Sequence, residues 1–345
     1  MKYNHVCVET FTHILPPIEI TSEELESQLE PVYTRLRLPV GRLEMMTGIH
    51  SRRVWEPGTG IAQVSAQTVN KAILESGIDK SLFGALIHAS VCRDFMEPAT
   101  AAGTHFRANM PENCLIFDVS NACMGLLDGV VLLANMVELG QIKAGVVVGT
   151  ENSRSLMETT IKTFNTDLTI TRKSSKNLFA SLTIGSGSAA IVLAHESISK
   201  TGARLLGGAF YTDSSGSKLC QSDESMQDGD FMHTDSVKLL EQGVQAANQC
   251  FPLFLNELNW SREDIHRTFC HQVGKAHSKL LFETLGLNPA IDFTTMEYLG
   301  NTGSAALPTA ASIGIQQGAV APNSNAALLG IGSGINVMML GIHFN

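Results

Sequence analysis

The feature of this sequence that most constrains its fold is a repeat that relates the two halves of the chain. Gly185-Ser186-Gly187 and Gly332-Ser333-Gly334 lie 147 residues apart in a chain of 345, and each precedes an apolar run. A Gly-Ser-Gly turn before a strand is common by itself, so the matching order of strands carries the argument. Further apolar runs precede the two turns, at residues 144–149 and 326–330. The repeat predicts one duplicated unit or two similar halves, residues 1–197 and 198–345.

Apolar runs that alternate with helical patterns indicate the fold class. Helices are expected over residues 22–36, with Ser22 as N-cap, and over residues 61–76, ending at Gly77. Short apolar runs predict strands at residues 82–92, 114–120, 144–149 and 188–194, the first two of them buried. This alternation is typical of an α/β fold with a mainly parallel sheet covered on both faces. The polar residues 152–177 are expected to form an exposed excursion.

Charge and cysteine content exclude several classes of protein. The chain has 24 basic and 33 acidic residues, a net charge of −9, which argues against general binding of nucleic acid. No apolar stretch approaches the roughly 18 residues needed to span a membrane, and the first residues do not resemble a signal peptide. Seven cysteines without a Cys-x-x-Cys pair argue against a disulfide framework and predict a cytoplasmic protein.

Cys123 is the candidate nucleophile, because it lies where the strand ending near Ser120 passes into an expected helix. The first N–H groups of a helix lack internal partners and carry partial positive charge, which favours a thiolate over a thiol. The thiolate is the nucleophilic form of cysteine. The alternative is that Cys123 is a small residue packed at a tight junction, and this segment alone does not decide between them.

The second half of the chain contains two residues that would complete such a site. His271 follows a short apolar run, and Asn301 lies in a Gly-rich loop before another helix. Each alone is more often structural, but a thiolate needs a proton acceptor and a condensation reaction needs donors to an oxyanion. His266, Cys270 and His277 lie near His271, yet no second pair with zinc-like spacing accompanies them. We therefore expect no metal.

Three segments together resemble the β-ketoacyl-acyl carrier protein synthase III branch of the thiolase superfamily. They are Asp118-Val119-Ser120-Asn121-Ala122-Cys123, His271-Gln272 and Gly300-Asn301-Thr302, in the Cys, His, Asn order of that family. The resemblance implies a five-layered α-β-α-β-α fold, usually in a homodimer, and an enzyme without a permanently bound cofactor. It implies that Cys123 carries the acyl group and that His271 and Asn301 bind the thioester oxygen of the second substrate.

The same resemblance implies further roles and two departures. The backbone N–H groups of Cys123 and Ser333 would form an oxyanion hole for acyl transfer. In the family an arginine precedes Thr-Gly-Ile and a tryptophan lies upstream, both binding coenzyme A, whereas here Met46 precedes Thr47-Gly48-Ile49 and no tryptophan comes earlier. The second departure is Glu97, which stands before Pro98 where ordinary synthases have an aromatic residue that reaches the neighbouring subunit.

In its glutamate before this proline, the chain is similar to the OleA family, whose members condense two acyl-CoA molecules head to head. His50-Ser51-Arg52-Arg53-Val54-Trp55 and Ser90-Val91-Cys92-Arg93-Asp94 are also similar, as is His271-Gln272-Val273. A malonyl donor forms its carbanion by losing carbon dioxide, whereas an ordinary acyl-CoA must lose an α-proton. A carboxylate held in an apolar tunnel, made more basic by desolvation, would take that proton. Glu97 would reach the neighbouring active site of a homodimer.

Three functions stay open at this point. The first is an OleA-type enzyme that joins two acyl-CoA molecules into a 2-alkyl-3-oxo acid. The second is a decarboxylative synthase III that uses malonyl-CoA or malonyl-acyl carrier protein. The third is a non-catalytic subunit that shapes the tunnel of a partner enzyme. Retention of Cys123, His271 and Asn301 together argues against the third function.

Overall fold

A computed structural model describes residues 1–223, 231–271 and 274–345 of the chain. Nine strands form one sheet, in the order β11-β12-β13-β8-β1-β7-β6-β4-β5. Their bounds are β1 (Val6–Ile14), β4 (Phe83–His88), β5 (Leu115–Asp118), β6 (Ala144–Glu151), β7 (Gly187–His195), β8 (Arg204–Thr212), β11 (Arg267–Cys270), β12 (Ser324–Gly332) and β13 (Asn336–Phe344). Two short ribbons lie outside this sheet: β2 (Ile18–Thr21) with β3 (Ser51–Val54), and β9 (Cys220–Asp223) with β10 (Phe231–Thr234).

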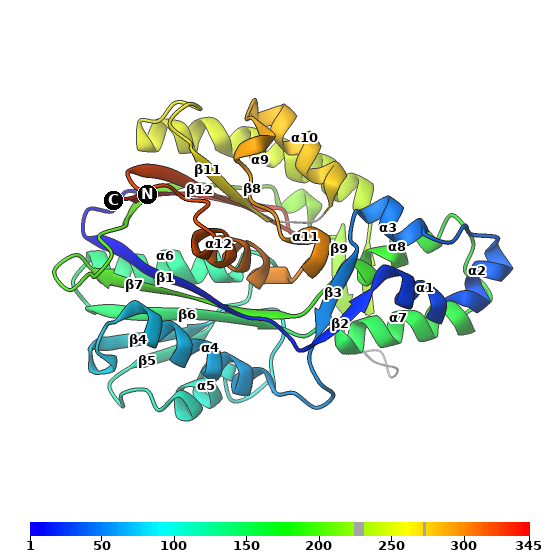
Figure 1. Ribbon diagram of the computed structural model, residues 1–345, viewed down its shortest axis with the longest axis horizontal. Helices are drawn as coiled ribbons and strands as arrows, with labels where there is room; N and C mark the ends of the chain where they lie inside the picture. The colour runs from blue at the N-terminus through cyan, green and yellow to red at the C-terminus, as the bar shows by residue number, and fades with distance from the viewer. Residues whose placement is uncertain (224–230, 272–273) are drawn as a thin grey trace.

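Helices and strands are stacked in five layers, as the fold class expected from the sequence requires (Figure 1). The strands divide between β1 and β8 into two sheet layers, and the central helices pack between these layers. The remaining large helices cover the outer faces. The central helices are α6 (Gly125–Glu138) and α12 (Ala306–Gln316), and the outer ones are α4 (Ile61–Ser76) and α5 (Thr100–Ala108) on one side, with α9 (Ser236–Leu258) and α10 (Lys275–Leu285) on the other.

The predicted repeat corresponds to a repeated strand topology. In the first half β4 pairs parallel with β6, which pairs antiparallel with β7, which pairs antiparallel with β1. In the second half β11, β12, β13 and β8 pair in the same order and the same directions. Each half also supplies one central helix. The division at residue 197 stays a prediction. Strands of both halves are hydrogen-bonded in one continuous sheet, so the sheet itself marks no boundary between them.

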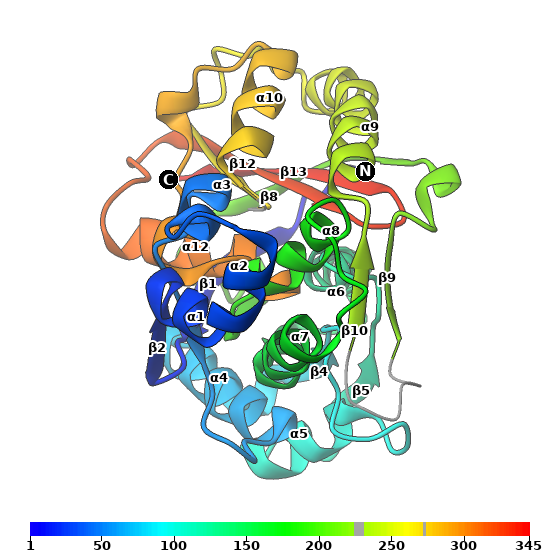
Figure 2. The same cartoon turned by 90° about the vertical axis from the view of Figure 1, so that its right-hand side faces the viewer.

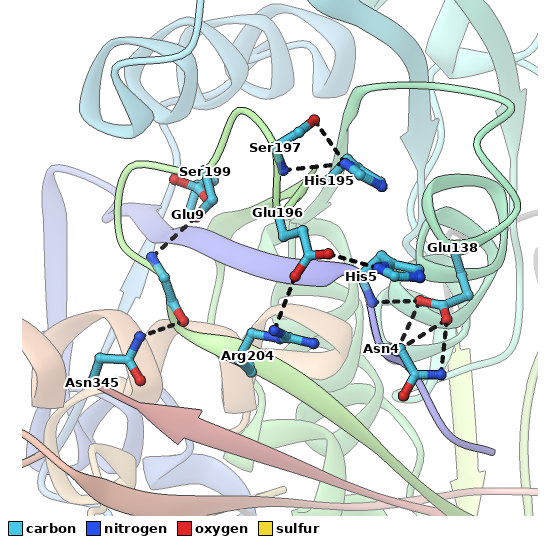
Figure 3. A network of polar contacts seen from close by, with 11 residues as sticks. Asn4, His5, Glu9, Glu138, His195, Glu196, Ser197, Ser199, Arg204 and Asn345 are labelled. Atoms are coloured by element: carbon cyan, nitrogen blue, oxygen red, sulfur yellow. Dashed lines mark hydrogen bonds and ion pairs between the residues drawn. The ribbon is translucent and has the colours of Figure 1, made fainter.

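Charged and polar side chains connect the two halves where they meet (Figure 3). Cys7 of β1 pairs with Arg204 of β8, where the strands of the two halves join in one sheet. Glu196 in that segment accepts hydrogen bonds from His5 Nδ1 at 2.7 Å and from Arg204 Nη1 at 3.1 Å. The carboxylate of Glu138, at the end of α6, accepts from the backbone N–H of His5 at 2.9 Å. His5 is thereby held against the first half, and Glu196 connects it to Arg204 of the second half.

Residues 152–177 do not form the expected exposed excursion. They contain α7 (Arg154–Thr166) and the start of α8 (Ser175–Phe179), and α7 buries Met157 and Phe164. These side chains lie in a separate apolar core with residues of two N-terminal helices, α1 (Ser22–Gln28) and α2 (Glu30–Leu36), on one side of the molecule (Figure 2). The high polarity of the segment concealed an apolar stripe at helical spacing.

Two further expectations about local structure are wrong. The helix predicted over residues 22–36 is two helices that meet at Leu29, and Thr21, rather than Ser22, caps the first of them. Ser22 instead donates its hydroxyl to the carbonyl of Ile49 at 2.6 Å. The strand predicted at residues 114–120 is short and lies at the edge of the sheet, where Leu115 is 52% exposed within a single chain. Its apolar sequence had predicted burial.

The remaining elements connect these layers and are short. They are α3 (Arg42–Thr47), η1 (Lys80–Leu82), η2 (Ala180–Thr183), η3 (Ser214–Gly216), η4 (Pro289–Ile291), α11 (Met296–Leu299) and η5 (Gly303–Ala305). Within the described ranges, no helix is both long and apolar enough to cross a bilayer. No disulfide joins any of the seven cysteines, all of which fall among the described residues.

Candidate active site

Cys123 lies in a turn between β5 and α6, two residues before the helix begins. The helix starts at Gly125 with Met124 as N-cap, so Cys123 precedes the position expected for it. Ala122, directly before the cysteine, has a φ of 46°, which is uncommon for a residue other than glycine. This conformation directs the chain sharply from the strand into the helix. Backbone strain of this kind is frequent at functional sites.

The turn that carries Cys123 packs closely on a strand from the other half. A Cβ atom at Gly332 of β12 would lie 2.6 Å from Met124 Cγ, and one at Gly330 would lie 2.8 Å from Met124 Cε. Any larger residue at these two positions would push the turn away. The two glycines therefore allow the nucleophile segment of the first half to approach the second half.

Ser333 lies in the loop that follows β12, and Asn336 connects this loop to the Cys123 turn. The Asn336 Nδ2 amide donates to Asn121 Oδ1 at 3.2 Å and to the Ser333 carbonyl at 3.2 Å. Asn121 in turn donates to Asp128 of α6 at 2.6 Å. These hydrogen bonds bring the two segments of the expected oxyanion hole together. They also place a fixed network beside the nucleophile.

His271 follows β11 directly and is buried. Its backbone N–H donates to the carbonyl of Leu329 at 3.0 Å, so it lies beside the end of β12 that contacts Met124. Burial, with a smaller contribution from nearby His277, lowers the pKa of His271 to about 3. The imidazole is therefore neutral at physiological pH and can accept a proton. Gln272 and Val273, which belong to the motif noted in the sequence, lie outside the described residues.

Asn301 is buried in a loop that contacts the first half of the chain. Its backbone N–H donates to the Thr183 carbonyl at 2.9 Å, and its own carbonyl accepts from Gly185 N at 2.9 Å. Its side-chain Oδ1 accepts from Gly303 N at 3.0 Å, which leaves the Nδ2 amide as the outward donor group. The first Gly-Ser-Gly turn of the repeat thus holds the asparagine loop.

Glu151, at the end of β6, is a residue of the site that the sequence reasoning missed. Its buried carboxylate accepts from the backbone N–H of Val91 at 3.1 Å, Cys92 at 3.2 Å and Ser304 at 3.2 Å, and from the Ser304 hydroxyl at 2.6 Å. Burial raises the pKa of this carboxyl group, while the four donated hydrogen bonds oppose that shift and suit an ionised carboxylate, which only accepts. Its one signal in the sequence is an acidic residue ending an otherwise apolar strand, Ala144–Glu151.

The electrostatic surroundings of Cys123 differ from those expected. Burial, with smaller contributions from the nearby carboxylate of Glu151 and thiol of Cys220, raises the pKa of the Cys123 thiol to about 12. The expected stabilisation of a thiolate by the helix start is wrong, because desolvation disfavours the charged form, the helix begins later and the Glu151 carboxylate lies nearby. With its pKa raised, Cys123 is a protonated thiol at neutral pH, so its proton must leave when it reacts.

Glu97 lies apart from these residues on an exposed loop, directly after exposed Phe95 and Met96. The apolar enclosure expected around its carboxylate is not formed within a single chain. Contacts with β12 and with Glu151 bring together segments from both halves, those that carry Cys123, Ser333, His271 and Asn301. Glu97 lies outside this group, at the surface. Within the described part of the chain, no group of three or more His, Cys, Asp or Glu residues could hold a metal ion.

Known proteins similar to this chain share both the fold and the whole length. The family model described as "Thiolase, N-terminal domain" matches residues 44–199, and "3-Oxoacyl-[acyl-carrier-protein (ACP)] synthase III C terminal" matches residues 255–342. An acyl-CoA:acyl-CoA alkyltransferase of Shewanella oneidensis is 38% identical, with 99% of each chain covered. One from Xanthomonas campestris is 32% identical, with 98% of each covered.

Solved structures agree with these relatives. A C→A variant of Xanthomonas campestris OleA superposes with a TM-score of 0.94 at 31% identity, covering 100% of this chain and 98% of that one. A 3-oxoacyl-(acyl carrier protein) synthase III from Xanthomonas oryzae gives the same TM-score at 30% identity, with both chains fully covered. The fold and the Cys, His and Asn segments define a condensing acyltransferase of the thiolase superfamily. Within it, this chain belongs to the acyl-CoA:acyl-CoA alkyltransferase family, OleA.

Proposed function

We propose that this enzyme joins two acyl-CoA molecules by a non-decarboxylative Claisen condensation and releases a 2-alkyl-3-oxo acid. The observation that carries the proposal is the position of Glu97 relative to Cys123. Variants of Xanthomonas campestris OleA alter one cysteine and one glutamate that lie 26 residues apart, and Glu97 and Cys123 are also 26 residues apart. A third variant alters a histidine 142 residues after that cysteine, against 148 residues from Cys123 to His271.

In the first half-reaction the Cys123 sulfur attacks the thioester carbonyl of one acyl-CoA. The neutral imidazole of His271 accepts the thiol proton as the new carbon–sulfur bond forms, because the Cys123 thiol keeps its proton until attack and becomes strongly acidic once its sulfur bonds to carbon. The backbone N–H groups of Cys123 and Ser333 donate to the tetrahedral oxyanion. When the carbon–sulfur bond to coenzyme A breaks, the imidazolium returns the proton to the departing thiolate. His271 is then neutral again.

In the second half-reaction a base removes the α-proton of another acyl-CoA. The Glu97 carboxylate takes that proton, and the His271 imidazole and the Asn301 Nδ2 amide donate to the enolate oxygen. The α-carbon attacks the acyl-Cys123 carbonyl, and the Cys123 sulfur leaves and takes up a proton. Water then cleaves the remaining thioester, which gives the 2-alkyl-3-oxo acid and free coenzyme A. No step requires a permanently bound cofactor.

Glu97 would act in the active site of a second copy of the chain. The outer edge of β5 ends the described sheet, so its backbone groups are available for pairing. Exposed apolar side chains surround this edge, with Met96 80%, Phe95 67% and Leu115 52% exposed. A homodimer formed here would cover these side chains and enclose Glu97 against the partner. The same proposal includes a cytoplasmic location. Acyl-CoA would supply both acyl groups, and an acyl carrier protein thioester is the alternative donor.

Two variants test the proposal when a long-chain acyl-CoA is the only substrate. Cys123→Ala should give no acyl-enzyme in intact-mass spectra. Glu97→Gln has nearly the same shape but lacks a basic carboxylate, so it should form the acyl-enzyme and yield no condensation product. A Glu97→Gln enzyme that condensed acyl-CoA at the normal rate would refute the proposal. Absence of an acyl-enzyme in the wild-type protein would instead support a non-catalytic subunit.

A decarboxylative synthase III is the second candidate, and the Xanthomonas oryzae synthase of equal structural similarity favours it. Such an enzyme would also use Cys123, His271 and Asn301 but would need no base. Release of carbon dioxide from malonyl-CoA that depends on His271 and Asn301 and is unaffected in Glu97→Gln would support this function. Condensation of acyl-CoA alone, without carbon dioxide release, would support the first proposal instead.

A further inference from the structure

The loop that carries Glu97 is held at both ends by aspartate side chains. This Glu97 loop is defined here as residues 94–100. At its start, the Asp94 carboxylate accepts from the backbone N–H of Ile61 at 2.7 Å and of Ala62 at 2.9 Å. At its end, the Asp118 carboxylate accepts from the N–H of Thr100 at 2.7 Å and of Ala101 at 2.8 Å. Glu97 lies midway between the two attachments.

These aspartates take the place of ordinary helix caps. Ile61 and Thr100 are the first residues of α4 and α5, whose N-cap residues, Gly60 and Ala99, provide no side-chain hydrogen bond. The first N–H groups of a helix need partners, and a carboxylate there also interacts favourably with the helix dipole. Since the caps come from other segments, they determine where the Glu97 loop lies as well as where the helices begin.

Asp118 connects the Glu97 loop to the strand that leads to the nucleophile. It is the last residue of β5, it pairs with His88 of β4, and Cys123 follows five residues later. The side chain of His88 is buried beneath it, with Nδ1 4.0 Å from Asp118 Oδ1 and Nε2 3.1 Å from Ser90 Oγ. The Asp118 carboxylate therefore links the end of the Glu97 loop to the strand that leads into the Cys123 turn.

The Glu97 side chain has no such support of its own. Among residues 1–223, 231–271 and 274–345, no hydrogen bond or ion pair to its carboxylate is formed. Its position is therefore set by the backbone of the loop. A base must lie within hydrogen-bond distance of the proton that it removes.

We propose that Asp118, together with Asp94, is a positioning residue for the Glu97 base. The two carboxylates fix the loop so that Glu97 meets the α-carbon of the second acyl-CoA in the active site of the partner copy. This inference rests on the proposed function, in which Glu97 removes the α-proton. Displacement of a reacting group by about 1 Å can cost about 100-fold in rate, so loss of either attachment should slow carbon–carbon bond formation to that extent.

The experiment separates positioning from helix capping in the full-length enzyme. Asp118→Ala removes the attachment, and the double variant Asp118→Ala with Ala99→Asp restores a local cap to α5 without the connection to β5. Asp264→Ala is the matched control, because Asp264 also accepts from a backbone N–H, that of Ser261 at 2.7 Å, in a surface turn of the other half. Thermal unfolding, acylation of Cys123 by intact mass and condensation of acyl-CoA are measured for each.

We expect Asp118→Ala to be less stable and to condense acyl-CoA about 100-fold more slowly, while Cys123 is acylated at the wild-type rate. The double variant should regain stability, since aspartate is a favourable N-cap, and still condense slowly. Asp264→Ala should condense normally. Asp94→Asn tests the other attachment, and a slow condensation with normal acylation is expected there too. If Asp118→Ala does not fold, the Asp94→Asn variant tests the positioning role by itself.

Three results would overturn the inference, and a fourth would refute the function on which it rests. Recovery of condensation in the double variant would mean that Asp118 only caps α5. An equal slowing of acylation and condensation in Asp118→Ala would mean that it acts on the nucleophile rather than on the base. Normal condensation by Glu97→Gln would refute the proposed function itself. If Glu97→Gln is inactive and both Asp118→Ala and Asp94→Asn condense normally, only the positioning role fails.

Discussion

The Glu151 carboxylate accepts a hydrogen bond from the Ser304 hydroxyl at 2.6 Å, although the two residues are 153 positions apart. Glu151 ends β6 in the first half of the molecule, and Ser304 belongs to the loop that follows Asn301 in the second half. The same carboxylate raises the pKa of the Cys123 thiol. One buried acidic group thus influences both the placement of the asparagine loop and the protonation of the nucleophile.

Glu151→Gln should make Cys123 more reactive and the protein less stable. The neutral amide no longer opposes the thiolate, so the pKa of Cys123 should fall and its alkylation by iodoacetamide at pH 8 should be faster. The amide NH₂ group would also face a backbone donor, which should lower the free energy of unfolding by about 1 to 3 kcal/mol. Peptide mapping of Cys123 and urea unfolding measure the two effects. Exposed Glu158→Gln is the control, and unchanged alkylation in Glu151→Gln would contradict the prediction.

Gly303→Ala should disturb the asparagine loop by contact as well as by strain. Gly303 has a φ of +58°, and a Cβ there would lie 3.1 Å from the Glu151 carboxyl group. We expect a loss of about 1 to 3 kcal/mol in stability and a condensation rate that falls more than the acylation rate. Gly318→Ala is a matched control, because Gly318 has a φ of +74° with nothing within 4 Å. If both variants behaved alike, strain alone would explain the effect.

Asn336→Ala should slow the acylation of Cys123 without unfolding the protein. Asn336 holds the Ser333 loop against Asn121, and an oxyanion-hole donor contributes about 100- to 1,000-fold in rate. Its loss should cost at least about tenfold, since the donor is displaced rather than removed. Mass spectrometry of samples quenched at successive times measures the rate of acyl-enzyme formation and tests this prediction. Asn325→Ala, at the opposite end of the same strand pair, should acylate normally.

Buried histidines should make the protein sensitive to mild acid. Burial lowers the pKa of His271 to about 3, and of His88 and His277 to about 4, whereas an unfolded chain protonates histidine near pH 6.5. Between pH 6.5 and 4 the unfolded state therefore binds more protons, and stability falls as pH falls. Each histidine should contribute about 1.4 kcal/mol per pH unit in this window.

Urea unfolding at pH 7, 6 and 5 measures this dependence. His277→Leu removes one buried histidine and should reduce the slope of stability against pH by roughly a quarter to a third, since His271, His88 and His13, whose pKa burial also lowers, contribute as well. The direction is the reverse of that for a histidine stabilised by a carboxylate, whose contribution would be lost as pH rises. Equal slopes for the variant and the wild-type protein would show that His277 does not take part.

Much of the architecture could be predicted from the sequence, because it depends on local patterns. Helical periodicity predicted α4 to the residue, and short apolar runs marked the central strands β6 and β7. The order of Cys123, His271 and Asn301, with a repeated turn at residues 185 and 332, indicated two related halves that share one site. These patterns can be read from one sequence because the spacing of apolar side chains follows the geometry of each helix or strand.

Only the tertiary structure decided how the candidate site is supported. Glu151, Asp94 and Asp118 hold backbone N–H groups that come from distant segments, and their local sequence does not show which groups they bind. The exposure of β5 and the burial within residues 152–177 likewise depend on which elements lie beside them. The pKa of Cys123 was mispredicted for the same reason. Residue spacing is a local property, whereas desolvation and charge interactions are set by neighbours that only the folded chain brings together.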